Sequence, residues 1–220
     1  MKNNDNIYKL TQEGLHFFGR MSASATHEIK NTLAIINENI GLMNDMAMIS
    51  QDGMMPIEQI NIISKNIKKQ VRRSNSIIQR LNQFSHKVDL SKQQADLEHT
   101  VKFTLEVASR LIDMHEVVIE IIPATAPLRI NANQFFLENL VWRAVESACH
   151  GVQKTKKISI SFIKDMEISS IRFIMDQTAH DFMDNLFNTD VDKALIDYMN
   201  VTIEKNRETN SFGLIWSTTN

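Results

Sequence analysis

Two long segments with a helical hydrophobic period, joined by a helix breaker, constrain the fold of this chain more than any other feature. From about Ile7 to Met48, apolar residues recur every three or four positions and form one stripe: Leu15, Phe18, Met21, Ala25, Ile29, Leu33, Ile36, Ile40 and Met43. From about Ile57 to Lys87, a second stripe consists of Ile57, Ile60, Ile63, Ile67, Val71, Ile78, Leu81 and Phe84. The intervening run, Ser50–Pro56, contains glycine and proline. This pattern predicts two amphipathic helices that form an antiparallel hairpin.

Each stripe is too wide to be buried by one partner helix, so the hairpin needs a further surface to cover it. Two hairpins from two copies of the chain can close a four-helix bundle, and we favour this homodimer. The second half of the same chain is the alternative cover.

Composition narrows the class of protein. The chain has 220 residues, 43% of them apolar, which is enough for a sizeable core. Its formal net charge of −2 argues against nucleic acid as the main partner. A single cysteine, Cys149, excludes an internal disulfide framework and fits a reducing compartment. The N-terminus is polar and no apolar run approaches the ~20 residues of a membrane span. We therefore expect a cytoplasmic protein without a membrane span.

After Asp89 the pattern changes to short strands and helices, which predicts an α+β domain with helices on one face of a sheet. We expect helices over about 91–113, 131–150 and 189–199, with Ser91 and Asn131 as N-caps of the first two. Strands are expected over 117–122, 157–164, 168–175, 201–204 and 212–217. The chain thus divides into a helical domain, residues 1–89, and an α+β domain, residues 90–220.

His27 is the candidate reactive residue of the first helix. It lies on the face away from the apolar stripe, roughly 200° around the helix from Ala25 and Ile29. An exposed histidine is usually a plain solvated side chain, and the chain has 7 histidines. The others, which lack a comparable context, are His16, His86, His99, His115, His150 and His180.

The run His27-Glu28-Ile29-Lys30-Asn31-Thr32-Leu33 resembles the phosphoacceptor box of bacterial sensor histidine kinases. In that family a helical hairpin dimerises into a four-helix bundle that presents the histidine. The order of elements after residue 90 is similar to the family's ATP-binding domain, an α/β sandwich. Thr32 stands where the family usually has proline, so we expect a less kinked first helix.

The resemblance is incomplete at the nucleotide site. Arg143, within the run 139–148, falls where the family has the asparagine that holds magnesium and phosphates, and arginine has no lone pair for a metal. Asp176 matches the aspartate that reads adenine, but Thr178 and His180 replace both glycines of the Asp-x-Gly-x-Gly motif. No glycine lies between Asp176 and Thr189 to form a phosphate-binding lid. The resemblance therefore implies a degenerate domain that binds no cofactor of its own.

An intact acceptor box beside a degenerate nucleotide site resembles the histidine phosphotransferases that derive from kinases. Such proteins pass phosphoryl groups between aspartates of receiver domains, so we expect His27 as acceptor and response-regulator receivers as partners. The receiver's acidic pocket would supply Mg²⁺, and we predict no metal site in this chain. The alternatives are an active kinase or phosphatase with an atypical ATP site, and an adaptor that docks a response regulator without chemistry.

Several residues have expected supporting roles. Glu28 can accept a hydrogen bond from the second ring nitrogen of His27 and stabilise the imidazolium. Asn31, one turn further on, can position a water molecule or the incoming phosphoryl group. A basic set can steer an acidic receiver onto the hairpin, although charged runs are usually just solvated. This set is Lys30, Lys65, Lys68, Lys69, Arg72 and Arg73.

Overall fold

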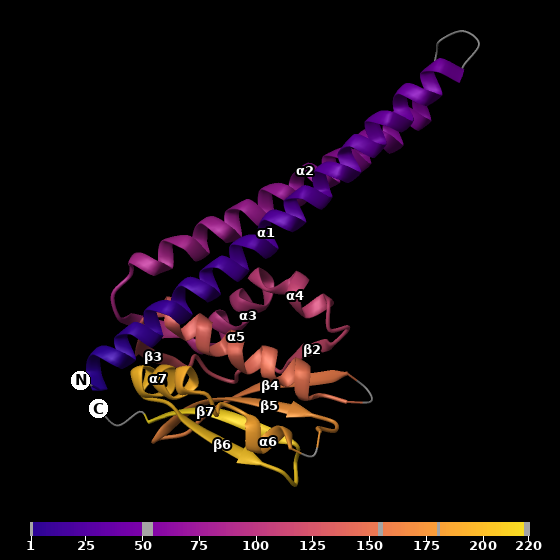
Figure 1. The fold of residues 1–220 in the computed structure, drawn as a ribbon. Helices are drawn as coiled ribbons and strands as arrows, with labels where there is room; N and C mark the ends of the chain where they lie inside the picture. Colours follow the sequence, from indigo (N-terminus) through magenta and orange to yellow (C-terminus); the bar gives the residue numbers. More distant parts are fainter. Residues whose placement is uncertain (1, 50–54, 154–155, 180, 218–220) are drawn as a thin grey trace.

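A long helical arm projects from an α/β domain in the computed structural model, which describes residues 2–49, 55–153, 156–179 and 181–217 (Figure 1). The arm consists of α1 (Lys2–Ile49) and α2 (Ile57–His86), which lie antiparallel as predicted. A 3-10 turn, Lys87–Asp89, leads from α2 into the second domain. None of the described helices is both long enough and apolar enough to cross a membrane.

The α/β domain contains two sheets. A five-stranded sheet has the strand order β2-β4-β5-β7-β6, in which only β2 and β4 are parallel. Its strands are β2 (Val118–Ile121), β4 (Lys157–Lys164), β5 (Ile168–Met175), β6 (Thr202–Asn206) and β7 (Ser211–Ser217). Two short strands, β1 (Gln93–Asp96) and β3 (Arg129–Ala132), pair separately. The predicted hairpin and α+β domain are therefore confirmed.

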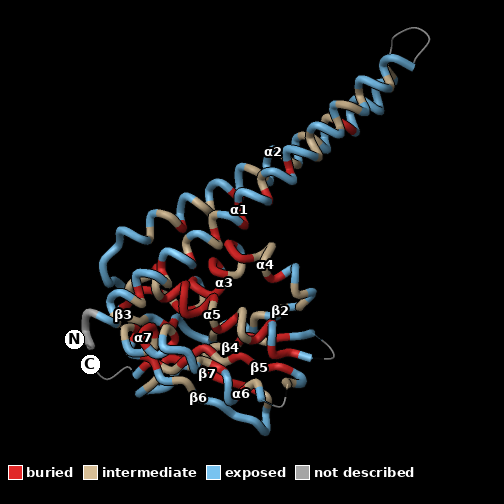
Figure 2. Tube along the Cα trace, in the orientation of Figure 1, coloured by how far each residue is buried: buried red, intermediate tan, exposed pale blue. Residues whose placement is uncertain are grey.

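The helices of this domain lie beside the sheet, and most of them contact the arm. They are α3 (Leu97–Val107), α4 (Ser109–Asp113), α5 (Gln134–Gly151), α6 (Phe182–Asn185) and α7 (Asp190–Met199). The longest, α5, lies between the sheet and the first part of α1 (Figure 1). Most residues of α5 are buried, because the sheet covers one side of the helix and the arm covers the other (Figure 2).

Two predicted helix starts are wrong because the short β1–β3 ladder was not foreseen. Ser91 does not cap a helix: residues 93–96 form β1, and Asp96 caps α3 by accepting from the backbone N–H of His99 at 2.9 Å. Asn131 lies inside β3, and Asn133 caps α5 instead, accepting from the N–H of Phe136 at 3.1 Å. In both cases the ladder displaces the cap towards the C-terminus, because strand pairing satisfies the backbone groups that the helix would have used.

The α/β domain covers only the base of the arm's apolar surface. Phe17 of α1 packs edge-on against Phe84 of α2, with ring centroids 5.3 Å apart, and against Phe135 of α5 at 5.5 Å. Further along the arm the stripes emerge into solvent, with Leu33 52% and Ile78 41% exposed (Figure 2). Intramolecular cover, the alternative raised from the sequence, thus applies to the base and leaves the outer part of both stripes open.

A buried ion pair fixes the turn between the two domains. Lys87 donates to the carboxylate of Glu138 in α5, and its ammonium lies 3.4 Å from the centroid of the Phe103 ring. The Glu138 side chain is only 2% exposed. Burial raises the pKa of Glu138 to about 7, against the opposing effect of Lys87. The linker is therefore attached to the domain through a carboxyl group that titrates near neutral pH.

This pKa predicts a pH dependence of stability. The folded chain holds the Glu138 proton up to about pH 7, whereas an unperturbed glutamate loses it near 4.5, so the folded state binds more protons between these values. The free energy of unfolding should fall by roughly 1–3 kcal/mol as pH rises through this window and level off above it. Urea titrations between pH 4.5 and 8 measure this slope. Glu138→Gln should flatten it, whereas Glu116→Gln, an exposed carboxylate paired with Lys156, should leave it in place. An unchanged slope in Glu138→Gln would contradict the assignment.

Candidate functional site

His27 and Asn31 lie exposed on α1, one turn apart, as the helical period predicted. His27 belongs to the outer surface of α1, so its imidazole can be reached by a partner protein. Thr32, in place of the family's proline, is buried. Its hydroxyl donates to the carbonyl of Ile29 at 2.8 Å and contacts the hydroxyl of Ser74 in α2. The residue therefore joins the two helices just beyond His27, and α1 continues unbroken through this point.

Glu28 does not face His27. Its side chain turns inwards between three helices, where one carboxylate oxygen accepts from Arg73 of α2 at 3.5 Å and the other from Ser109 of α4 at 3.4 Å. The carboxylate therefore lies at the junction of the arm with the α/β domain. In this conformation its oxygens face these donors, so the expected hydrogen bond to the His27 ring is not formed.

The basic residues of α2 form a surface on the outer part of the arm. Lys65, Lys68, Lys69 and Arg72 are exposed and line a shallow groove of about 580 Å³. Within the described part of the chain, none of these four forms an ion pair. Arg73 is different, because it also contacts Glu28, and Lys30 lies on α1 beside the acceptor face. The expected steering set thus consists of four residues on the outer part of α2, Lys30 on α1, and Arg73, which is exposed but contacts Glu28.

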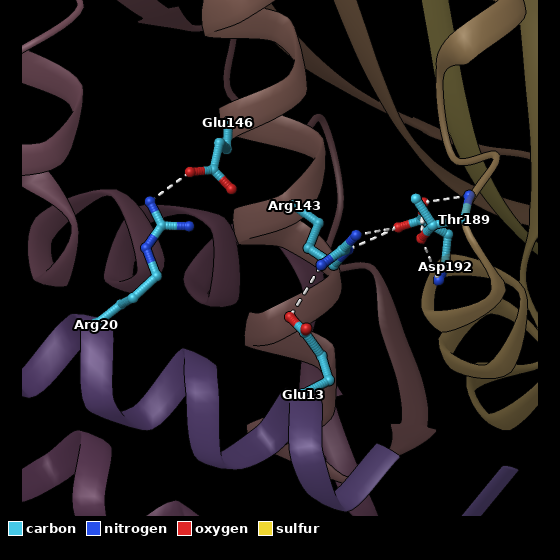
Figure 3. Close-up of polar contacts among 6 residues, drawn as sticks. All are labelled: Glu13, Arg20, Arg143, Glu146, Thr189 and Asp192. Atoms are coloured by element: carbon cyan, nitrogen blue, oxygen red, sulfur yellow. Dashed lines mark hydrogen bonds and ion pairs between the residues drawn. The ribbon is translucent and has the colours of Figure 1, made fainter. Parts of the chain in front are cut away.

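Arg143 is held by two carboxylates at the position that the resemblance assigns to a nucleotide-binding asparagine (Figure 3). Its Nε donates to Asp192 Oδ1 of α7 at 2.7 Å, and its NH1 donates to Glu13 of α1 at 3.0 Å. Burial lowers the pKa of Arg143, but the two carboxylates outweigh burial and leave the pKa above its ordinary value. The guanidinium is therefore a permanently charged internal crosslink between α1, α5 and α7.

Asp192 is itself fixed by the start of α7. Its second carboxylate oxygen accepts from the backbone N–H of Thr189 at 2.9 Å and from the Thr189 hydroxyl at 2.6 Å, completing a capping box (Figure 3). The backbone N–H groups of Thr189 and Asp192 thus donate to side chains of the same helix start. They are therefore not available to bind an anion, as the N–H groups of a helix N-terminus otherwise can.

An aromatic ring fills part of the remaining predicted nucleotide site, and an open pocket of about 310 Å³ lies beside it. Phe182 of α6 lies against Gly151, the last residue of α5, so closely that a methyl group on Gly151 would come within 2.3 Å of the ring. Asp176 follows β5 and is exposed, and the Thr178 hydroxyl donates to Asn210 at 3.1 Å. His180 lies outside the described residues. Among those that are described, no group of three histidine, cysteine or acidic side chains could hold a metal ion.

Sequence reasoning missed the charged residues that join the arm to the α/β domain. Besides Glu13 and Asp192, Arg20 of α1 forms an ion pair with Glu146 of α5 (Figure 3). Its guanidinium carbon also lies 5.5 Å from the centroid of the Trp142 ring. A signal was available, because Glu13 and Arg20 are seven residues apart on one face of α1. Without a structure, however, nothing distinguished them from ordinary surface charges.

Comparisons with known proteins place this fold. No protein-family profile matches the chain, and no curated protein matches it in sequence. Among solved structures, the Acinetobacter baumannii histidine kinase AdeS aligns with 88% of this chain and 98% of its own, at 17% identity and a TM-score of 0.50. The chain therefore shares the fold of this histidine kinase.

Two other solved structures align at lower TM-scores. Histidine kinase ThkA in complex with the response regulator protein TrrA covers 99% of this chain and 66% of its own, at 19% identity and a TM-score of 0.46. The mycobacterial sensor histidine kinase MprB covers 58% of this chain and 97% of its own, at 8% identity and a TM-score of 0.45.

The contact between Gly151 and Phe182 can be tested by a double-mutant cycle. Gly151→Ala forces the Phe182 ring to move, so it should destabilise the chain by about 1–3 kcal/mol. In a Phe182→Ala background the same substitution should cost much less, because the clash is gone. Chemical denaturation of the four proteins measures the coupling. Equal costs in the two backgrounds would show that the ring does not close this end of α5. Gly19→Ala, whose added methyl meets nothing within 4 Å, is the matched control.

Proposed function

We propose that this chain is a histidine phosphotransferase of a two-component phosphorelay, which exchanges a phosphoryl group between His27 and receiver-domain aspartates without using ATP. The observation that carries the proposal is the contrast between two sites. His27 lies open on α1, whereas Arg143 is crosslinked to Glu13 and Asp192 where a kinase would hold its nucleotide. The fold shared with a histidine kinase supports a role in two-component signalling.

The proposed reaction needs little from the protein beyond an accessible nucleophile. The unprotonated imidazole nitrogen of His27 attacks the phosphorus of a receiver's aspartyl phosphate, forming a P–N bond as the P–O bond to the carboxylate breaks. The aspartate leaves as a carboxylate, and the reverse step loads another receiver. Asn31, exposed one turn along α1, would donate its amide N–H to the phosphoryl oxygens. The receiver's acidic pocket would bring the Mg²⁺ that neutralises the transferring group.

The packing around Arg143 argues against the alternative of an ATP-dependent kinase. A nucleotide phosphate would have to displace two carboxylates from the guanidinium, and a magnesium ion would find no lone pair on it. The Phe182 ring against Gly151 would also have to move. The kinase alternative retains Asp176 in its favour, because this residue is exposed at the end of β5.

Charge supports an acidic partner on the outer arm. Lys65, Lys68, Lys69 and Arg72 lie exposed along about two turns of α2, so their fields add. A receiver with an acidic surface would be attracted to this part of the arm. Lys30 would contribute from α1. The cytoplasm is the proposed compartment, consistent with Cys149 being a buried free thiol.

A homodimer is the second part of the proposal. Exposed apolar residues continue along the outer arm on both helices, and exposed apolar surface of this kind commonly marks a protein–protein contact. They are Leu33, Ile40, Ile60, Val71 and Ile78. A second hairpin would cover them and complete a four-helix bundle.

The dimer predicts that a charge on this surface separates the subunits. Leu33→Glu should weaken self-association by at least roughly tenfold, because it would bury a carboxylate between apolar helices. Sedimentation velocity over a micromolar concentration series measures this. Met114→Glu, at an exposed apolar residue of the α/β domain, should leave the subunits associated. The dimer is contradicted if the unmodified chain sediments as a monomer throughout the series.

Transfer from a phosphorylated receiver tests the main proposal. The chain should acquire acid-labile, base-stable label, and His27→Ala should abolish it because the attacking nitrogen is gone. His16→Ala, at another exposed histidine of α1, should retain full labelling. Label that never appears, or that persists in His27→Ala, rules the phosphotransferase out. Receiver binding that survives without label would favour the adaptor, and calorimetric binding of ATP with magnesium at micromolar concentration would favour the kinase.

A further inference from the structure

Helix α5 presents three charged side chains of alternating sign to the helical arm. Glu138 meets Lys87 at the end of α2, Arg143 meets Glu13, and Glu146 meets Arg20. Figure 3 shows the last two pairs, which join α1 to α5. We name this set the α5 clamp: the ion pairs Glu138–Lys87, Arg143–Glu13 and Glu146–Arg20.

The alternation of sign makes the clamp selective for one arrangement. If α1 exchanged its partners on α5, Glu13 would face Glu146 and Arg20 would face Arg143, so both contacts would be repulsive. Apolar contacts, such as that of Phe17 with Phe135, tolerate sliding and rotation of the helices better than ion pairs do, because apolar side chains attract one another in any arrangement. The clamp therefore determines how the α/β domain is oriented on the arm.

Burial keeps the clamp effective at physiological salt. The Arg143 side chain is 22% exposed, and Glu13 and Asp192 are still more buried. The Lys87 side chain is 14% exposed, and that of Glu138 is the most buried of the set. Charges withdrawn from water are screened much less than exposed ones, and a buried charge that loses its partner is strongly disfavoured. Opening the two domains would therefore leave several half-buried charges without partners.

The clamp leads directly to the acceptor. From Glu13 to Glu28, α1 follows the α/β domain for about 22 Å, and the last polar contact of this seam is that of Ser109 in α4 with the Glu28 carboxylate. Glu28 is the residue next to His27. The orientation of the α/β domain thus decides whether the Ser109 hydroxyl reaches the Glu28 carboxylate, next to His27.

We propose that the α5 clamp holds the α/β domain in one fixed orientation, in which Ser109 supports Glu28 beside His27, and that Arg20 and Glu146 are positioning residues for the acceptor. The part concerning transfer rests on the proposed phosphotransferase function. In this arrangement the domain acts as a rigid support for the acceptor helix, and Arg143 serves the attachment of the two domains.

A charge-swap series with a distance measurement tests the orientation without reference to activity. Spin labels at Asn75→Cys on α2 and Glu167→Cys after β4, in a Cys149→Ala background, report the distance between arm and domain by pulsed electron resonance. Labelled chain is mixed with excess unlabelled chain, so that each pair is intramolecular. Arg20→Glu and Glu146→Arg should each broaden the distance distribution, and the double variant Arg20→Glu/Glu146→Arg should restore a narrow one. Arg20→Gln, which adds no like-charge contact, should broaden it to a smaller extent and is measured in case Arg20→Glu does not fold.

The same proteins give the effect on the acceptor. Each single variant should lower the rate constant for transfer at saturating phosphorylated receiver by about tenfold, with a smaller change in KM, and the double variant should recover most of it. A distribution that stays narrow in every single variant, or that the double variant fails to restore, overturns the proposal. If the distances follow the expected order but the unmodified chain accepts no phosphoryl group, the clamp stands and the phosphotransferase function fails.

Discussion

The burial of the first half of α1 against α5 is the contact on which the rest of the structure depends. Phe17 brings the arm, the end of α2 and the start of α5 together in one aromatic cluster. The same contact withdraws Glu13 and Arg20 from water, so each must find a partner of opposite charge. The apolar cluster therefore provides the driving force for docking, whereas the charged pairs decide which docked arrangement is allowed.

One substitution in α5 has consequences at two places. An asparagine at the Arg143 position could offer a carbonyl oxygen to a metal and would be short enough to leave a pocket open. Arginine offers five donors and a long reach, which lets it contact α1 and α7 together. Arg143, which cannot ligate a metal ion, is thus well suited to join the domains.

Much of the architecture could be predicted because its signals are periodic and local. The stripes of α1 and α2 and the β4–β5 hairpin follow from hydrophobic patterning alone. The β1–β3 ladder was missed because its strands have four residues each and pair over a long separation in sequence. The orientation of Glu28 was missed for a related reason. The Glu28 side chain is oriented by Arg73 and Ser109, which come from distant segments of the sequence. A helical wheel of α1 shows only residues of α1, so it contains neither of them.

The candidate site was therefore predictable to the extent that it depends on one helix. The position and exposure of His27 and Asn31 follow from the period of α1, whereas the roles of Glu13, Arg20 and Asp192 depend on which surfaces meet. Charged residues on amphipathic helices have many possible partners, and only the packed structure selects among them.

The unbroken course of α1 gives the molecule the geometry of a lever. Thr32 keeps the helix straight where a proline would bend it, and beyond Glu28 the arm extends for a further 32 Å or so without support from the α/β domain. Ile49 lies about 48 Å along α1 from the fulcrum at Phe17, so a tilt of only about 5° there would move the far end by roughly 4 Å. A small rotation of α1 at the base therefore produces a larger displacement of the outer arm, where a partner protein would bind. Conversely, a partner that moves the outer arm would rotate α1 at its base.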